Sequence, residues 1–212
     1  MTISIVTGLP GFGKTLKLAE FGVKAMAEGR HVYANFKMHN LPRPDLYTHY
    51  NDPLEVLGKV SNALILMSEV GILLDQMKMY EVPHETWVEL RQHRKDGVNI
   101  VADAQSMSDV AYTFRKLIQY QYHIYGKYNL LKPSRWLKHG LTVQLVRVFN
   151  PQPKGDDYGR RYWMHNPSYF HYYDTNYKLE KTETPFEQAE RVIQSPYADA
   201  LYDRYGEIIK NF

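Results

Sequence analysis

The 212-residue sequence predicts an α/β fold, in which helices flank a mostly parallel central sheet and an antiparallel β extension and a terminal helix follow. Two observations carry this prediction. Up to Gly126, short apolar runs alternate with segments rich in helix-forming residues, and strands separated by helices form parallel sheets that are covered on both faces. Beyond Gly126, two strand-like segments are joined by a turn-rich stretch, which is typical of antiparallel strands.

Each element of the first part is predicted by its own pattern. Five apolar segments are typical of strands, namely 3–7, 31–36, 63–67, 98–102 and 119–125. Four helices are predicted between them, namely 15–28, a helix that begins at the capping sequence Asp52-Pro53-x-Glu55, 85–95, and 110–117. This alternation is that of a parallel sheet with helical crossovers.

The second part has a different pattern. Segments 141–149 and 160–173 are strand-like, and the segment between them is rich in proline and glycine. The last segment, 184–212, is predicted to be helical. We therefore predict a core over 1–126, a β-hairpin extension of the same domain over 127–183, and a C-terminal helical segment over 184–212.

The composition excludes several classes of protein. The chain has no cysteine, which excludes disulfides and thiolate zinc sites. Hydrophobic residues make up 44% and charged residues 23%, as in a globular domain rather than a disordered chain. The sequence opens on a strand pattern, so we expect no signal peptide within it. No apolar run approaches the roughly 20 residues that a membrane-spanning helix needs, so we expect no membrane span within this chain.

Residues 8–15 read Gly-Leu-Pro-Gly-Phe-Gly-Lys-Thr and match the Walker A pattern G-x-x-x-x-G-K-[ST] in full. The match lies between an apolar strand and an amphipathic helix, where such a loop binds phosphates. Lys14 is expected to reach the β- and γ-phosphates of ATP, and the hydroxyl of Thr15 to ligate Mg²⁺. The expected nucleotide contacts are Gly8, Pro10, Gly11, Phe12, Gly13, Lys14, Thr15 and Leu16. The sequence therefore predicts a P-loop NTPase with ATP and Mg²⁺ as its cofactors.

A P-loop hydrolase also needs an acidic residue at the end of a second buried strand. Two apolar runs end in this way, one at Ser68-Glu69 and the other at Asp103. We favour Glu69 as the general base that polarises the attacking water, with Asp103 as the alternative. Ser68 stands where an aspartate is usual, and it is expected to hold Mg²⁺ through water. Gln105 follows the second run and is expected to sense the γ-phosphate.

Negative charge that develops on the γ-phosphate is commonly neutralised by an arginine. Arg91, Arg94 and Arg115 are expected near the strand ends that carry the chemistry, and Arg94 is the predicted catalytic arginine. If it acts from a neighbouring subunit, the active unit is a ring. The alternative for each of the three is a solvated helix arginine.

The net charge of +3 is unevenly distributed along the chain. Residues 127–161 hold eight Lys or Arg against two Asp, a local net charge of +6. Aromatic residues are interleaved with these cations, which suits a nucleic-acid surface with Arg160 and Arg161 among its expected contacts. The alternative is a solvated hairpin whose charges keep the protein soluble.

The ordered set of motifs resembles the Zot (zonula occludens toxin) domain family, which includes the filamentous-phage assembly ATPases and belongs to the HerA/FtsK-like superfamily. The matching pieces are residues 8–15, residues 28–35 (Glu-Gly-Arg-His-Val-Tyr-Ala-Asn), the apolar strand ending at Glu69, residues 91–97, Gln105, and residues 172–175. Together they span most of 1–175. Two features depart from the family pattern, namely Ser68 in the place of an aspartate and the absence of the membrane helix that filamentous-phage members carry.

The resemblance implies an ATPase motor of phage virion assembly that moves viral DNA, by packaging or by extrusion. It implies a homo-oligomeric ring with phage DNA and other virion or membrane assembly proteins as partners, placed in the host cytoplasm, at the inner membrane or on the virion. Two other functions compete with this one. One is a nucleotide-gated interaction protein, and the other is a small-molecule kinase. DNA-stimulated hydrolysis separates the motor from both.

Overall fold

The structure is a computed structural model that describes residues 2–74, 82–132, 141–164 and 167–173. All of them belong to one compact unit, Met1–Tyr177. The predicted C-terminal helix over 184–212 lies outside the described residues. The division of the chain after residues 126 and 183 stays a prediction.

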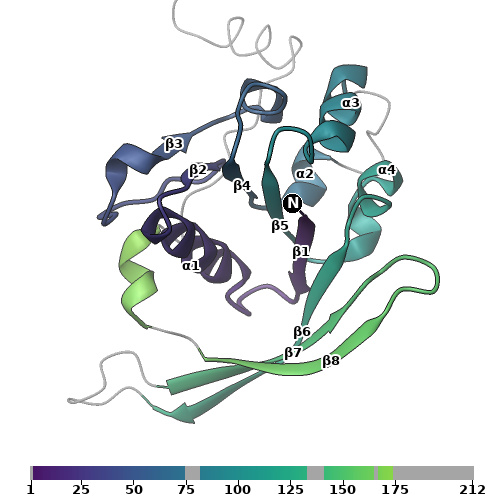
Figure 1. The fold of residues 1–212 in the computed structure, drawn as a ribbon. Coiled ribbons are helices and arrows are strands. Elements are labelled where there is room, and N and C mark those ends of the chain that lie inside the picture. Colours follow the sequence, from purple (N-terminus) through teal and green to yellow (C-terminus); the bar gives the residue numbers. More distant parts are fainter. Residues whose placement is uncertain (1, 75–81, 133–140, 165–166, 174–212) are drawn as a thin grey trace, which may run out of the picture. The chain divides into compact units, whose positions relative to one another are not determined.

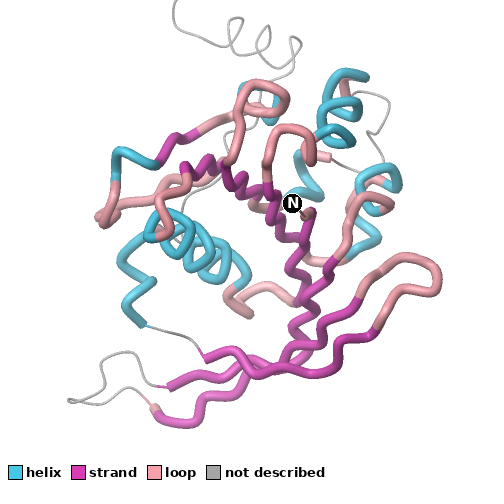
Figure 2. Tube along the Cα trace, in the orientation of Figure 1, coloured by secondary structure: helices cyan, strands magenta, loops and turns pink. Residues whose placement is uncertain are grey.

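Eight strands form one sheet in the order β3-β2-β4-β5-β1-β6-β7-β8 (Figure 1, Figure 2). Six of them run parallel: β1 (Ile3–Gly8), β2 (His31–Ala34), β3 (Tyr47–His49), β4 (Ala63–Met67), β5 (Asn99–Ala104) and β6 (Tyr120–Leu131). The last two, β7 (Leu141–Phe149) and β8 (Asp157–Met164), extend the sheet with antiparallel pairing. The predicted fold class is therefore confirmed.

Helices cover both faces of the parallel part (Figure 1). Helix α1 (Lys14–Ala27) packs on one face, and α2 (Val70–Leu73), α3 (His84–Gln92) and α4 (Tyr112–Arg115) lie on the other. Successive side chains of a strand point to opposite faces. Ile5 of β1 accordingly belongs to the core under α2–α4, whereas its neighbour Val6 belongs to the core under α1. This double burial explains why the parallel strands read as unbroken apolar runs.

Strands β6, β7 and β8 form an antiparallel extension, called the β-ribbon below. Its inner face packs against α1, because Val146 shares a buried cluster with residues of that helix. Lys127 and Gln144 are cross-strand partners on this inner face. Gln144 is two residues from Val146, and Lys127 is three residues from Ile124 because the bulge after Ile124 adds one residue. The outer face carries Tyr128, Leu145, Arg147, Arg160 and Tyr162, as the strand register shows.

The structure corrects several predicted boundaries. The strand predicted over 160–173 ends at Met164, and a 3-10 helix, Pro167–Tyr172, follows it. The helix predicted at Asp52 is a single 3-10 turn, Pro53–Glu55, although its capping box is formed as expected. Strand β3 was not predicted, because three residues are too short for an alternating pattern to be visible.

The strand predicted over 119–125 is longer than expected and ends at Leu131. Its second half includes a bulge between Ile124 and Gly126 and carries exposed side chains. An apolar run was therefore absent there, and antiparallel pairing with β7 stabilises the strand instead. No helix in the described part of the chain is both long and apolar enough to cross a membrane.

Candidate nucleotide-binding site

The segment that matches the Walker A pattern, called the phosphate-binding loop below after its predicted role, joins the carboxyl end of β1 to α1. Gly13 is the residue before α1 and has a left-handed backbone with φ 78°, which glycine adopts without steric strain. Gly8 lies so close to β6 that an added Cβ would stand 2.8 Å from the carbonyl oxygen of Ile124. The two glycines therefore allow a tight loop that leads into the amino terminus of a helix, where backbone N–H groups attract anions.

Lys14 is folded back into its own loop. Its ammonium donates to the carbonyl oxygens of Gly8 at 2.9 Å and Leu9 at 3.3 Å. Burial lowers the pKa of Lys14, and the nearby carboxylates of Asp103 and Glu69 oppose that shift. A cation is thus held at the loop by two carbonyl oxygens.

Asp103 is the carboxylate at the centre of the site. It is 1% exposed at the end of β5, the strand that lies between β1 and β4. The Thr15 hydroxyl donates to its Oδ2 at 3.2 Å, and the Glu69 backbone N–H donates to its Oδ1 at 2.6 Å. The Ser68 hydroxyl lies 3.4 Å from both carboxylate oxygens. One buried carboxylate therefore joins the Walker A threonine to the turn that follows β4.

Burial raises the pKa of Asp103 from 3.8 to about 6. The amide of Glu69, the Lys14 ammonium and the Thr15 hydroxyl oppose this rise, because they stabilise the charged form. A buried carboxylate without a paired cation in contact is poorly solvated, so it is suited to receive positive charge.

Glu69 lies at the same edge of the sheet, directly after β4. Its side chain is exposed, and its backbone has the left-handed values φ 52° and ψ 48°. A non-glycine residue seldom adopts this region, and such strain persists only where the surroundings enforce it. The hydrogen bond from the Glu69 amide to Asp103 is one such constraint.

A second constraint comes from Asn35, which follows β2 and is 1% exposed. Its amide nitrogen donates to the carbonyl oxygen of Ser68 at 2.9 Å, and its side-chain oxygen accepts from the Ser68 N–H at 2.7 Å. No motif in the sequence predicted a role for Asn35. The available signal was a polar side chain at the end of the predicted strand 31–36.

Asn35→Leu is expected to destabilise the fold by about 2–3 kcal/mol, because two buried backbone groups of Ser68 lose their partners. Hydrolysis should fall more than the folded fraction does, since the Glu69 turn is released. Urea unfolding and the turnover of folded protein measure the two effects. The matched control is Asn51→Leu at an exposed position. Equal turnover per folded molecule in both variants would contradict the positioning role.

The remaining predicted site residues do not all gather here. Gln105 directly follows β5 at the carboxyl edge and is exposed, so its role as a phosphate sensor stays a prediction. Arg94 precedes β5, and its guanidinium faces the side-chain amide of Gln119. The backbone N–H of Gln119 donates to the carbonyl oxygen of Ile3, at the start of β1. That contact places Arg94 at the amino edge of the sheet, opposite the phosphate-binding loop.

Arg91, in the last turn of α3, and Arg115, which ends α4 just before β6, also precede strands rather than follow them. We expected the three arginines near the carboxyl ends of the strands, where Glu69 and Asp103 lie. Within one subunit this expectation is wrong. A role for Arg94 across a subunit boundary stays a proposal.

The oxygen donors of this cluster fit Mg²⁺. This ion takes hard oxygen ligands and commonly keeps several waters, with one or two protein groups and the phosphates completing its shell. The Thr15 hydroxyl and the Asp103 carboxylate are 3.2 Å apart and provide two such groups. Ser68, the predicted holder of a metal-bound water, donates to Asp103 in this structure.

Comparison with known proteins supports the fold. Scans of the sequence against models of protein families and against curated proteins gave no match. Among solved structures, the N-terminal domain of zonular occludens toxin from Neisseria meningitidis is 18% identical, with TM-score 0.54 over 82% of this chain and 98% of that one.

Two further structures are similar. The genome packaging NTPase B204 of Sulfolobus turreted icosahedral virus 2, in complex with ATP-gammaS, is 13% identical, with TM-score 0.51 over 78% of this chain and 97% of that one. A third structure, an ATPase domain, is 7% identical, with TM-score 0.50 over 82% of this chain and 84% of that one. The fold of this chain is therefore that of a P-loop NTPase of the Zot-like kind.

Proposed function

We propose that this protein is an ATPase motor of phage virion assembly, which couples ATP hydrolysis to the translocation of viral DNA. The observation that carries the proposal is the cluster of Lys14, Thr15, Asp103 and Glu69 at one edge of the sheet. The three similar structures support it, since their names describe a toxin domain, a genome packaging NTPase and an ATPase domain.

The roles of the residues follow from their positions. The Lys14 ammonium moves from the loop carbonyls to the β- and γ-phosphates. Thr15 and Asp103 would hold Mg²⁺, which neutralises phosphate charge when it is bound. Glu69, with its amide anchored on Asp103, presents its carboxylate as the base that polarises the attacking water. Gln105 orients groups around the γ-phosphate.

The proposal includes a homo-oligomeric ring. Arg94 faces away from the site of its own subunit, so it can neutralise the transition state only from a neighbouring subunit. Other virion or membrane assembly proteins would be partners, with the motor in the host cytoplasm, at the inner membrane or on the virion.

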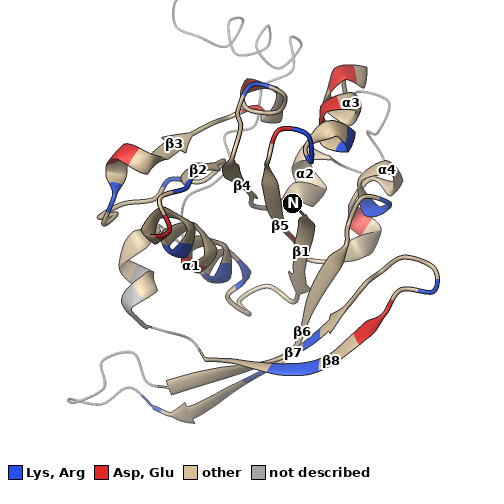
Figure 3. Cartoon of the chain, in the orientation of Figure 1, with Lys and Arg blue, Asp and Glu red and all other residues tan. Residues whose placement is uncertain are grey.

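The outer face of the β-ribbon is the proposed DNA surface. Figure 3 shows Lys and Arg along β7 and β8. Arg160 and Tyr162 of β8 are exposed on the same face as Tyr128 of β6, so a cation and two rings are available for phosphates and bases. Arg147 is paired with Asp157 at 2.6 Å, which removes part of the predicted positive charge.

The ribbon also changes the expected pair of contacts. Arg160 and Arg161 are successive residues of β8, and they point to opposite faces. They therefore cannot both reach a DNA strand that lies on the outer face.

Arg160→Gln is expected to weaken DNA binding and to flatten the plot of log affinity against log salt by about 0.7–0.9, because one phosphate contact and its counterion release are lost. Arg161→Gln removes the same charge from the inner face and is the matched control. DNA titrations at several salt concentrations give both slopes. Equal slopes in the two variants would contradict the outer face as the DNA surface.

One observation favours the nucleotide-gated interaction protein as a second candidate. Leu130 and Leu131 are 61% and 55% exposed at the end of β6, beside Tyr128 at 57%. Exposed apolar groups of this kind suit a protein partner. The deciding experiment is ATP turnover with and without single- and double-stranded DNA. Stimulation by DNA supports the motor, and ATP binding without stimulated turnover supports the interaction protein.

A further inference from the structure

The β-ribbon holds the tip of the phosphate-binding loop. Lys127 of β6 donates its ammonium to the carbonyl oxygen of Gly11 at 2.7 Å. The side-chain amide of Gln144, on β7, donates to the carbonyl oxygen of Phe12. Gln144 is 1% exposed, so this contact is shielded from water. Two neighbouring peptide groups of the loop are therefore fixed from outside by residues more than 110 positions away.

The other side of the loop is held differently. The carbonyls of Gly8 and Leu9 accept from Lys14, which belongs to the loop itself. Lys14 must leave these carbonyls when it moves to the phosphates. The ribbon contacts involve no group that the proposed mechanism moves, so they can persist when the nucleotide is bound.

Peptide geometry connects these contacts to phosphate binding. In a planar trans peptide, the C=O and N–H groups point in opposite directions. A donor that fixes the Phe12 carbonyl toward the ribbon therefore points the Gly13 N–H away from it. Gly13 precedes α1, at the helix terminus where backbone N–H groups bind phosphate. Gln144 thus sets the direction of a group that the nucleotide needs.

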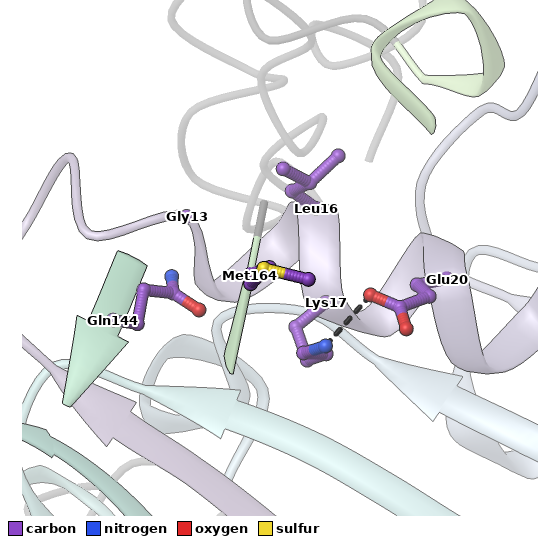
Figure 4. A pocket seen from close by; sticks show the side chains of 6 residues that line it. All are labelled: Gly13, Leu16, Lys17, Glu20, Gln144 and Met164. Carbon is purple, nitrogen blue, oxygen red and sulfur yellow. Dashed lines mark hydrogen bonds and ion pairs between the residues drawn. The ribbon is translucent and has the colours of Figure 1, made fainter. Parts of the chain in front are cut away.

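The surroundings of these contacts are packed. Figure 4 shows a small pocket where Gln144 and Met164 of the ribbon lie beside Gly13, Leu16 and Lys17 of the loop and α1. The Lys17 ammonium lies 4.5 Å from the ring centroid of Trp163 on β8. All three ribbon strands therefore meet the loop or the first turn of α1.

We propose that Lys127 and Gln144 are positioning residues of the nucleotide site. They hold the loop tip in its phosphate-binding form, so that the affinity for nucleotide depends on the conformation of the β-ribbon. The inference rests on the proposed ATP binding. It adds a physical connection between the loop and the surface proposed for DNA.

Lys127→Met and Gln144→Leu test this connection, since each keeps the approximate size of the side chain and removes the donor. Each variant is expected to bind MgATP about tenfold more weakly, as the loss of one hydrogen bond to the loop implies. KM for ATP should rise to a similar extent while kcat at saturating ATP falls much less, because the hydrolytic groups are untouched. Lys127→Arg, which restores a cationic donor, should recover most of the affinity.

Lys132→Met is the matched control, since it removes the same charge from an exposed position further along the chain. Calorimetric titration with MgATP and steady-state turnover give the binding and kinetic constants for each protein. Unchanged affinity in folded Lys127→Met overturns the inference, and this arm stands alone if Gln144→Leu does not fold. A wild-type protein that fails to bind MgATP contradicts the proposed function itself.

Discussion

Lys14→Ala is expected to lower kcat/KM for ATP by about 10³-fold or more, because the phosphates lose the only cation that the Walker A loop provides. The fold should survive, since the hydrogen bonds of the Lys14 ammonium within the described residues go to the carbonyls of Gly8 and Leu9 in its own loop. Titration with a labelled nucleotide and a phosphate-release assay measure binding and turnover separately.

Lys24→Ala is the control for Lys14, because it removes a lysine from the exposed side of the same helix, where it pairs with Glu20. This variant should turn over ATP at the wild-type rate. Wild-type turnover in Lys14→Ala would remove the Walker A loop from the mechanism.

Asp103→Asn is expected to reduce ATP hydrolysis by about 10²–10⁴-fold while it makes the nucleotide-free protein more stable. The amide keeps an oxygen to accept from the Glu69 N–H, but it removes the charge that would hold Mg²⁺ beside Thr15. High Mg²⁺ should recover turnover only in part, because the amide retains the hydrogen bond to the Glu69 turn but cannot replace the anionic ligand beside Thr15. Glu69→Gln tests the general base separately and should leave the affinity for MgATP nearly unchanged.

The direction of the stability change follows from the pKa of Asp103, which is about 6 in the folded protein and 3.8 in the reference state. Between these values the folded state binds more protons than the unfolded state, so stability falls as pH rises through this window. Above pH 6 the full penalty of about 2–3 kcal/mol is present. Asp103→Asn removes it, so the variant should be more stable at pH 7.5 and similar to wild type near pH 4.

Denaturant unfolding across this pH range, without nucleotide or metal, measures the difference. Burial lowers the pKa of His93, which makes both proteins less stable as pH falls below about 6.5. Subtracting one curve from the other cancels this common contribution. A variant less stable than wild type at pH 7.5 would show that the hydrogen bonds of the carboxylate outweigh its desolvation.

Local patterns in the sequence were sufficient for much of the fold. The Walker A loop, α1 and the apolar strands β1, β4 and β5 lie within a few residues of their predicted positions, because each is set by neighbours along the chain. The antiparallel extension was also recognised from its turn-rich segment. Element ends were less accurate where tertiary pairing decides them, as in the second half of β6.

The arrangement of the site could not be predicted in the same way. Asp103 contacts Thr15 because β5 lies between β1 and β4 in the sheet. The order of strands in a sheet cannot be predicted from local sequence patterns. The same holds for Asn35, whose partner Ser68 is 33 residues away. The predicted position of Arg94 was wrong because its segment precedes β5. It therefore lies at the amino edge of the sheet, whereas the site lies at the carboxyl edge.

Strand β6 is paired with the parallel sheet at one end and extends beyond it at the other. It pairs with β1 through Tyr120–Ile124, and its remaining residues to Leu131 extend past β1 by roughly 20 Å at about 3.3 Å per residue. A tilt of about 10° at the paired end would move the far end by roughly 3–4 Å over that length. Lys127 lies in this extension, close to the end that is paired with β1. A small displacement of the phosphate-binding loop can therefore produce a larger displacement at the far end of β6.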